Sequence, residues 1–179
     1  MAVLLLADVV EGKLATDQVA KTLTAVKSLG PVTLLVAGTG GDAAAAEAAT
    51  LAGVARVLFA EDHAYCHGMS EPTAALVVSL AGDYEHIVAA SGALSKSVLP
   101  RVAAMLDVMV ISEVLSVVDG STFERPIYAG NAIQTVKSSD ATKVMTIRTA
   151  TFDAAGKGSN APVEKVSASV DGSLSAWVE

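Results

Sequence analysis

The sequence is poor in cysteine, aromatic residues and charge, and each shortage limits how the protein can be built. The single cysteine, Cys66, excludes an internal disulfide and fits a reducing compartment. Aromatic residues make up 4% of the chain, so its core must be built from Val, Leu, Ile and Ala. Charged residues make up 17% against 52% hydrophobic ones, which favours a permanent partner or a neighbouring domain that covers apolar surface.

Basic residues and long hydrophobic runs are scarce as well. Lys and Arg number 12 against 19 Asp and Glu, and the resulting net charge of −7 argues against nucleic-acid binding. The apolar run from Val3 to Leu6 is closed by Asp8, and it lacks a basic leader and a cleavage site. No run reaches the ~18 apolar residues that a transmembrane helix needs. We therefore expect a soluble intracellular protein.

Apolar runs of strand type alternate with helical periods over the first 111 residues. Continuous apolar strands separated by helices are typical of a parallel sheet covered on both faces, and 179 residues suffice for one such core. The expected strands are 3–7, 32–36, 55–60, 86–90 and 108–111, and the expected helices are 16–30, with Thr16 as cap, 43–52, with Asp42 as cap, 72–80 and 98–106. These elements predict a three-layer α/β/α domain with a mostly parallel twisted sheet.

The alternation of strands and helices ends after Ile111. Residues 114–118, 123–137 and 143–149 have the pattern of antiparallel hairpins, and Gly130 indicates a bulge inside a strand or a close backbone approach. We therefore expect a C-terminal antiparallel extension of the sheet. The predicted α/β domain covers residues 1–155. Residues 156–179 are predicted to form a linker with one last strand at Val166, Ala168 and Val170, and Trp177 to be either a buried anchor or a residue that packs on absent sequence.

A glycine-rich turn, Gly38-Thr39-Gly40-Gly41, leads into Asp42 and Ala43 between a predicted strand and a predicted helix. This spacing fits the G-x-G-x-x-G/A dinucleotide fingerprint, with Gly38 and Gly40 at the turn and Asp62 as the acid for the ribose. However, the motif follows the second strand, and Asp42 occupies the helix N-terminus where a pyrophosphate would lie. We favour a capped turn and keep a small NAD(P)-binding oxidoreductase as an alternative.

The loop from Ser91 to Ser97 is a second candidate. Its hydroxyls, Lys96 and a helix N-terminus suit a phosphate, which keeps a stand-alone adenine-nucleotide-binding module as a further alternative. The spacing does not match a P-loop, and a polar loop whose Ser caps the helix explains the same residues. A metal site at His63, Cys66 and His67 is disfavoured because structural zinc needs four ligands.

Nucleophilic catalysis has little support, because no G-x-S-x-G sequence occurs and the acids are scattered. The more informative polar residues lie in or beside apolar elements, where Arg usually marks a salt bridge or an interface. Tyr128 and Asn131 are expected either to face the core or to lie at an interface. The candidate interface residues are Arg125, Tyr128, Asn131 and Arg148.

Six phrases spread in order over the chain carry a family resemblance. IYAGNA, within the phrase Phe123 to Ser138, and TFDAA, within Thr146 to Ala155, are the specific ones; the others are AVLLLAD at Ala2 to Asp8, LLVAGT at Leu34 to Thr39, VARVLFAED at Val54 to Asp62 and LPRVAAMLDV at Leu99 to Val108. The chain resembles the N-terminal domain of the electron transfer flavoprotein α subunit, in its α-proteobacterial form.

The resemblance implies a function for the whole complex. The family is an αβ heterodimer with one FAD that carries electrons from acyl-CoA dehydrogenases and related flavoenzymes to a membrane quinone oxidoreductase. This segment would be a Rossmann-like scaffold of the adenine-nucleotide α-hydrolase type, an electron-carrier part and not an enzyme. It would be cytoplasmic in a bacterium and lie in the mitochondrial matrix in a eukaryote.

The resemblance also implies where the cofactors lie. FAD would be bound mainly by the C-terminal half of α, which begins in the family with a segment like RPELTSA-VVVSGGRG, and AMP would belong to the partner β subunit. No such segment occurs before the chain stops at Glu179. We therefore expect no cofactor-binding residue and no metal ligand in this segment, and expect the β subunit and the FAD domain as its partners.

Overall fold

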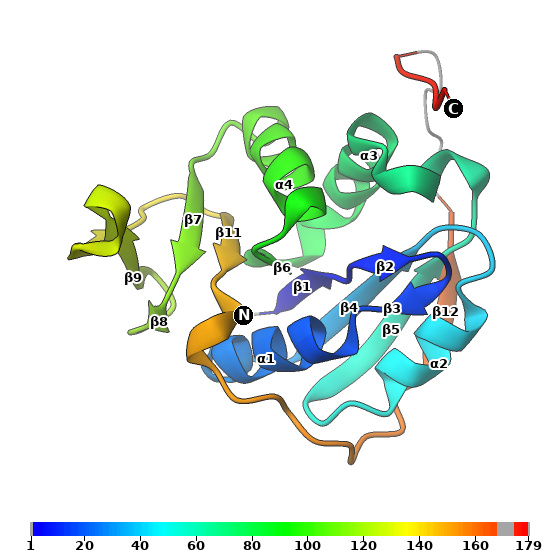
Figure 1. The fold of residues 1–179 in the computed structure, drawn as a ribbon, viewed down its shortest axis with the longest axis horizontal. Coiled ribbons are helices and arrows are strands. Elements are labelled where there is room, and N and C mark those ends of the chain that lie inside the picture. The colour runs from blue at the N-terminus through cyan, green and yellow to red at the C-terminus, as the bar shows by residue number, and fades with distance from the viewer. Residues whose placement is uncertain (1, 168–173, 179) are drawn as a thin grey trace.

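The computed structural model describes residues 2–167 and 174–178, and its centre is a seven-stranded sheet (Figure 1). All neighbouring strands in this sheet are parallel. The inner strands are buried along their length, which explains their apolar sequences. In spatial order the strands are β12 (Val163–Val166), β5 (Val54–Ala60), β4 (Val32–Ala37), β1 (Val3–Leu6), β6 (His86–Ala90), β11 (Lys143–Ile147) and β7 (Val110–Val114).

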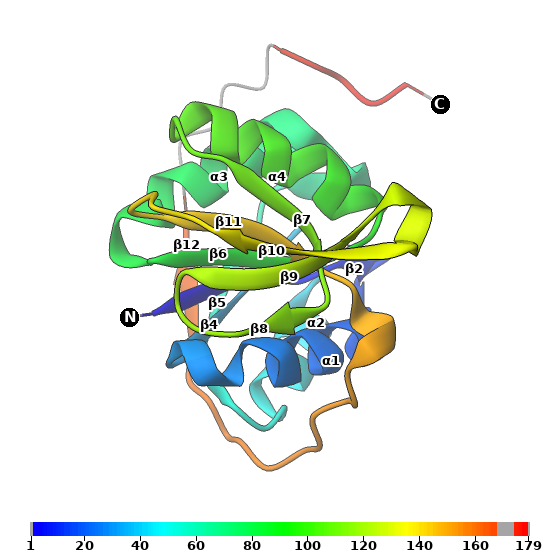
Figure 2. The same ribbon diagram turned by 90° about the vertical axis from the view of Figure 1, so that its left-hand side faces the viewer.

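Helices cover both faces of this sheet (Figure 2). Helices α1 (Thr16–Val26) and α2 (Asp42–Ala49) pack on one face, and α3 (Ser70–Leu80) and α4 (Ala93–Met105) pack on the other. Each side of the sheet has its own apolar cluster, with Leu23 of α1 in one and Leu99 of α4 in the other. Burying one such side chain stabilises the fold by about 1.5–3 kcal/mol. The predicted three-layer, Rossmann-like α/β class is confirmed.

Two small antiparallel sheets complete the domain. One contains β10 (Ala132–Lys137), β9 (Thr122–Ile127) and β8 (Ser116–Val117), in that order, and the other pairs β2 (Val9–Val10) with β3 (Lys13–Leu14). The larger of the two projects beyond β7 at one end of the molecule (Figure 1). Short 3-10 turns among the described residues are η1 (Lys27–Leu29), η2 (His63–Gly68), η3 (Ala81–Asp83), η4 (Tyr128–Gly130) and η5 (Thr149–Thr151).

The expected pairing of residues 143–149 was wrong. Strand β11 lies between β6 and β7 and is parallel to both. The antiparallel extension is therefore not C-terminal, because it is inserted between two strands of the main sheet. Gly130 marks neither a bulge within a strand nor a close backbone approach, since it lies in the η4 turn that joins β9 to β10 and an added Cβ would meet nothing within 4 Å.

All four helix starts differ from the expected ones, and α3 begins at Ser70, two residues before the expected start. Thr16 and Asp42 are the first helical residues, and Ala15 and Gly41 occupy the cap positions without a side-chain cap bond. Gly41 is needed there because an added Cβ would lie 2.9 Å from the Phe59 ring. Helix α4 begins at Ala93 and not at residue 98, because the Ser95 hydroxyl accepts a 3.0 Å hydrogen bond from the Gly92 amide.

Residues 156–167 run along the α2 side of the domain and end in β12. The amide of Ala52 donates to the Gly156 carbonyl at 2.8 Å, and the amide of Ala161 donates to the Ala49 carbonyl at 3.0 Å. The last strand therefore begins earlier than expected, and Ala168 and Val170 lie outside the described residues. The domain boundary at residue 155 stays a prediction. Among the described residues, no helix has the length and hydrophobicity to cross a membrane.

Candidate functional site

The order of the central strands reverses at β1. The chain places β4 and β5 on one side of β1 and β6 on the other, and in such sheets ligands bind at the carboxyl ends of the strands beside this reversal. A cavity of about 810 Å³ opens at that position, which we call the switch-point cavity. Its lining residues are Asp8, Val9, Val10, Glu11, Gly12, Ala37, Gly38, Thr39, His63, Tyr65, Cys66, His67, Gly68, Ala93, Leu94 and Ser97.

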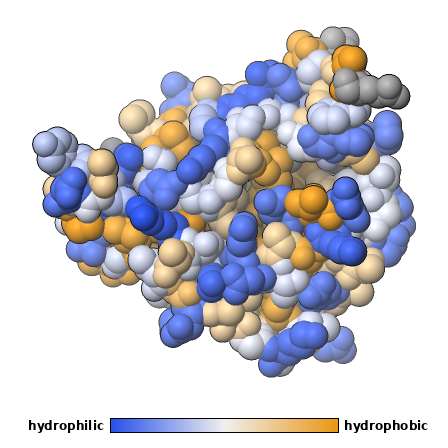
Figure 3. All heavy atoms as spheres, viewed as in Figure 1, coloured by the Kyte–Doolittle hydropathy of each residue, from blue (hydrophilic) through white to orange (hydrophobic). Residues whose placement is uncertain are grey.

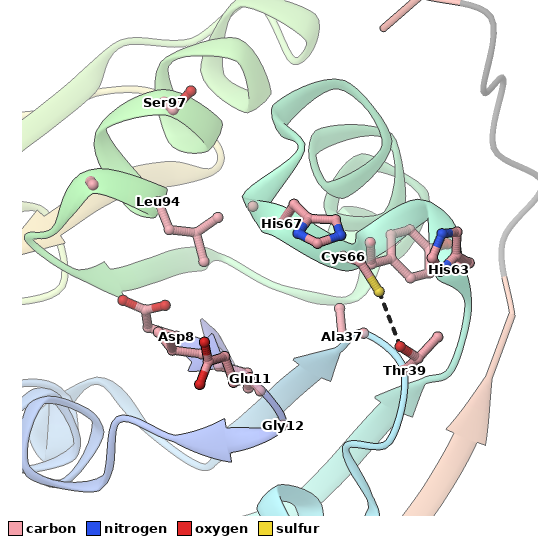
Figure 4. A pocket seen from close by; sticks show the side chains of 16 residues that line it. Asp8, Glu11, Gly12, Ala37, Thr39, His63, Cys66, His67, Leu94 and Ser97 are labelled. Atoms are coloured by element: carbon pink, nitrogen blue, oxygen red, sulfur yellow. Dashed lines mark hydrogen bonds between the residues drawn. The ribbon is translucent and has the colours of Figure 1, made fainter. Parts of the chain in front are cut away.

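Loops that follow β1, β4 and β5, together with the first turn of α4, supply the cavity wall. After β1 the chain makes a tight β2–β3 hairpin, whose two turn residues Glu11 and Gly12 have φ values of 50° and 74°. In Figure 4 the carboxylates of Asp8 and Glu11 lie across the opening from Leu94 and His67. The cavity thus combines an acidic edge with an apolar and aromatic one.

Asp8 is the most unusual of these residues. It directly follows β1 and lies half-buried. Within the described part of the chain, its carboxylate accepts no hydrogen bond and forms no ion pair. Partial burial raises the pKa of Asp8 above its ordinary value, because the charged form loses water. One Asp8 oxygen lies 3.8 Å from the Cβ position of Gly92, beside the N-terminus of α4. A carboxylate therefore occupies the place where that helix would attract an anion.

The predicted glycine motif follows β4. Gly38 and Gly40 have φ values of 137° and 65°, so the turn requires glycine, and Gly38 also donates its amide to the Ala60 carbonyl at 3.1 Å. Asp62, proposed as the ribose ligand, accepts a 2.9 Å hydrogen bond from the Ala64 amide and caps η2. Gly38 lines the switch-point cavity, whereas Gly40 and Asp62 do not. The motif residues thus have local structural roles.

Ser91 and Lys96, proposed as phosphate ligands, meet at Glu113. Lys96 Nζ lies 2.8 Å from Glu113 Oε1, and the Ser91 hydroxyl donates to the same carboxylate. Burial raises the pKa of Glu113, but the bonds from Lys96 and Ser91 outweigh it and hold the pKa below its ordinary value. Glu113 sits in an irregularity of β7 with φ 60°. Neither Ser91 nor Lys96 lines the cavity, and Glu113 engages Lys96 in an ion pair and Ser91 in a hydrogen bond.

His63, Cys66 and His67 lie on η2 at the cavity wall. Cys66 Sγ lies 3.1 Å from the Thr39 hydroxyl, and the described residues contain no group of three ligands suited to a metal ion. The His67 ring stacks on Trp177 with centroids 4.4 Å apart. Trp177 is 61% exposed, so it is not a buried anchor. This stack and the 2.9 Å hydrogen bond from the Ser175 hydroxyl to Glu71 place the described tail segment 174–178 near η2 and α3.

The predicted interface residues do not form one cluster. Tyr128 and Asn131 lie together at the tip of the β9–β10 hairpin, where Asn131 Nδ2 donates to the Tyr128 carbonyl at 3.0 Å. Tyr128 is 82% exposed, which rules out the core-facing alternative. Arg125 lies on β9, where its Nη2 donates to the Ser112 hydroxyl at 2.9 Å, and the exposed Arg148 follows β11.

The β9–β10 hairpin exposes several large apolar side chains to solvent. Ile127, Tyr128 and Ile133 are all exposed, and five of the six residues of β10 are exposed as well. In the described part of the chain β10 pairs only with β9, so its other edge is open. Hydrophobic residues show at the surface over this end of the molecule in Figure 3. An open strand edge with apolar side chains favours pairing with another chain.

Sequence reasoning missed Asp8, Glu11 and Gly12 at the cavity. The signal for the hairpin was present, since Glu11-Gly12 separates two short apolar segments and such a pair suits a two-residue turn. Asp8 gave a weaker signal, a carboxylate directly after a buried strand. The sequence could not show that Asp8 lacks a hydrogen-bond or ion-pair partner, because only the fold shows which side chains approach it.

Fold and cavity together define a Rossmann-like α/β domain with an open switch point and a projecting antiparallel hairpin. A family model described as "Electron transfer flavoprotein domain" matches residues 3–171, and the chain therefore belongs to that family. This finding and the relatives below confirm the resemblance seen in the sequence.

Three relatives show how closely the chain resembles the family. It is 61% identical to the electron transfer flavoprotein subunit alpha of Paracoccus denitrificans over 178 residues, which cover 99% of this chain and 58% of the relative. The subunit of Pseudomonas aeruginosa is 46% identical over 180 residues, with 99% and 58% covered. The mitochondrial subunit of Arabidopsis thaliana is 39% identical over 161 residues, with 85% and 44% covered. The chain thus spans about half the length of these relatives.

Proposed function

We propose that this chain is the scaffold domain of an electron transfer flavoprotein α subunit. The observation that carries the proposal is the family match over residues 3–171, together with 61% identity to an α subunit across 99% of the chain. The scaffold role is supported by the candidate phosphate ligands Ser91 and Lys96, which lie outside the switch-point cavity and are engaged with Glu113. In this proposal the domain positions a flavin held elsewhere and performs no catalysis.

The β subunit is the proposed partner of the β9–β10 hairpin. The open edge of β10 and the exposed Ile133 and Tyr128 offer main-chain pairing and apolar contact at one surface. Such a contact would cover hydrophobic area that otherwise faces water, as permanent interfaces do. The C-terminal FAD domain of the α subunit is the second proposed neighbour, and AMP is assigned to the β subunit.

The proposed electron path follows from the family alone. Acyl-CoA dehydrogenases and related flavoenzymes would reduce the FAD of the complex, and an electron transfer flavoprotein-quinone oxidoreductase at the membrane would oxidise it. The flavin supplies the redox chemistry, and the protein supplies binding and orientation. We propose a cytoplasmic location for a bacterial protein and the mitochondrial matrix for a eukaryotic one.

Coexpression with a β subunit tests the proposal. The 179-residue chain purified alone should be colourless, while the chain with β and the FAD-binding half of α should form one complex that absorbs as a flavoprotein. A yellow 179-residue chain without other polypeptides would contradict the proposal. NADH titration followed by Trp177 fluorescence separates it from the oxidoreductase alternative, since saturable binding to the chain alone would favour that alternative.

A further inference from the structure

The charges around the switch-point cavity are one-sided. Its lining contains the carboxylates of Asp8 and Glu11, no Lys or Arg is among the lining residues, and the two imidazoles, His63 and His67, come from η2. The nearest candidate cation on α4, Lys96, is held by Glu113 at 2.8 Å and does not line the cavity. A phosphate or carboxylate ligand near Asp8 and Glu11 would therefore meet repulsion from both carboxylates.

Asp8 lacks the partner that a half-buried carboxylate usually has. Burial removes part of its water, and within the described residues no donor or cation replaces that water. Polar groups left without partners beside a cavity indicate a missing ligand more strongly than a cavity alone does.

The rest of the wall suits a carbon skeleton. Val9, Leu94 and Ala93 contribute apolar surface, and Leu94 lies across the opening from Asp8 (Figure 4). The volume of about 810 Å³ exceeds what a single ion or water needs and falls in the range of small-molecule sites. A ligand with an apolar body and a positive end would satisfy the carboxylate and cover the apolar wall together.

We propose that the switch-point cavity binds a small aliphatic amine, whose ammonium group pairs with Asp8 and whose methylene chain packs against Leu94 and Val9. Glu11 lies on the same acidic edge and adds attraction from a more exposed position. The proposal is independent of the electron-transfer role, because neither Glu113 nor any residue of the β9–β10 hairpin lines the cavity.

Matched probes test the charge requirement. Butane-1,4-diamine, butane-1,4-diol and succinate share a four-carbon chain and differ in charge. Each is titrated calorimetrically against the complete protein from cells, together with any chains that purify with it. The differences between the three affinities then give the electrostatic contribution to binding. The diamine should bind saturably with one site, and the diol and succinate should bind at least tenfold more weakly. Equal binding of the diol would replace the amine by a hydroxylated ligand and overturn the proposal, as would binding of succinate.

Matched variants test the site. Asp8→Asn should weaken diamine binding at least tenfold, and Glu11→Gln should weaken it less. Asp107→Asn is the control, because this exposed Asp follows the other end of α4 and the substitution removes the same charge. The affinity of Asp107→Asn for the diamine should stay within twofold of that of the parent protein. If Asp8→Asn and Asp107→Asn lost diamine affinity equally, the amine would be binding only to the net negative charge of the molecule. That result would contradict the proposed site.

Trp177 supplies a local signal. It is the only Trp in the chain and stacks on His67, which lines the cavity, so diamine binding should change its fluorescence with the same midpoint as the titration heat. Glu11→Gln has an exposed side chain and should fold normally, so it keeps the test decisive if Asp8→Asn folds poorly. Unchanged diamine affinity in both variants would contradict the proposal.

Discussion

The Nε2 atom of His86 lies 2.9 Å from the carbonyl oxygen of Gly120. A carbonyl only accepts, so Nε2 carries the proton, and the buried Nδ1 has no partner among the described residues. This bond joins β6, at the centre of the main sheet, to the turn between β8 and β9. The ring also meets Phe123 of β9 edge-on, with centroids 6.4 Å apart. The small sheet is thus fixed to the core at two neighbouring points.

Acid should destabilise the protein through His86. Burial lowers the pKa of His86 below 6.5, so the unfolded chain takes up a proton near pH 6.5 while the native chain does not. Stability is then present above pH 6.5 and is lost as the pH falls below it. Between pH 7.5 and 5.5 the free energy of unfolding should fall by up to about 1.4 kcal/mol from this residue.

Urea unfolding at the two pH values measures the effect. His86→Gln, which has no titrating ring, should remove most of this pH dependence. An identical pH dependence in His86→Gln and the parent would show that the native ring is protonated as easily as the unfolded one.

Asp8→Asn should raise the melting temperature at pH 7. The raised pKa of Asp8 means that the native state binds its proton more tightly than the unfolded state, so this residue costs stability as the pH rises through its native pKa. The gain should shrink toward pH 3.8 and below, where the carboxyl is protonated in both states. Scanning calorimetry across this range tests the sign, and a lower melting temperature for Asp8→Asn at pH 7 would contradict it.

Phe123→Ala should be among the most destabilising substitutions in the small sheet. The ring is fully buried against the core, and removing it leaves a cavity, so we expect a loss of about 3–5 kcal/mol. Ile133→Ala, on the exposed strand of the same hairpin, should cost less than about 0.5 kcal/mol. Equilibrium unfolding of both variants provides the comparison, and equal losses would show that the hairpin does not depend on Phe123 for its attachment.

The main sheet was predictable because its strands are buried on both faces and therefore have continuous apolar sequences. Val144, Met145 and Ile147 carry the same signal in β11. Their position after a hairpin suggested antiparallel pairing, and sequence alone does not show that the chain returns to the space between β6 and β7. The pairing was fixed by long-range contacts, not by local pattern.

The candidate sites were less predictable than the fold. The glycines after β4 were correctly placed between a strand and a helix, but whether such a turn holds a ligand depends on neighbouring side chains. Lys96 of α4 illustrates the limit, since its partner Glu113 lies 17 residues further along the chain on β7, in a backbone conformation that few residues adopt. Asp8 shows the converse, because its significance lies in the absence of any such partner.

The affinity of the α subunit for the β subunit, compared between the parent and Ile133→Asp, tests the central claim most directly. If the β9–β10 hairpin is the contact, one charge in its exposed apolar surface should weaken association at least a hundredfold in light-scattering or native mass measurements, while the melting temperature of the isolated chain stays unchanged. Undiminished association of a folded Ile133→Asp variant would contradict the account of this domain as a scaffold that joins its partner through that hairpin.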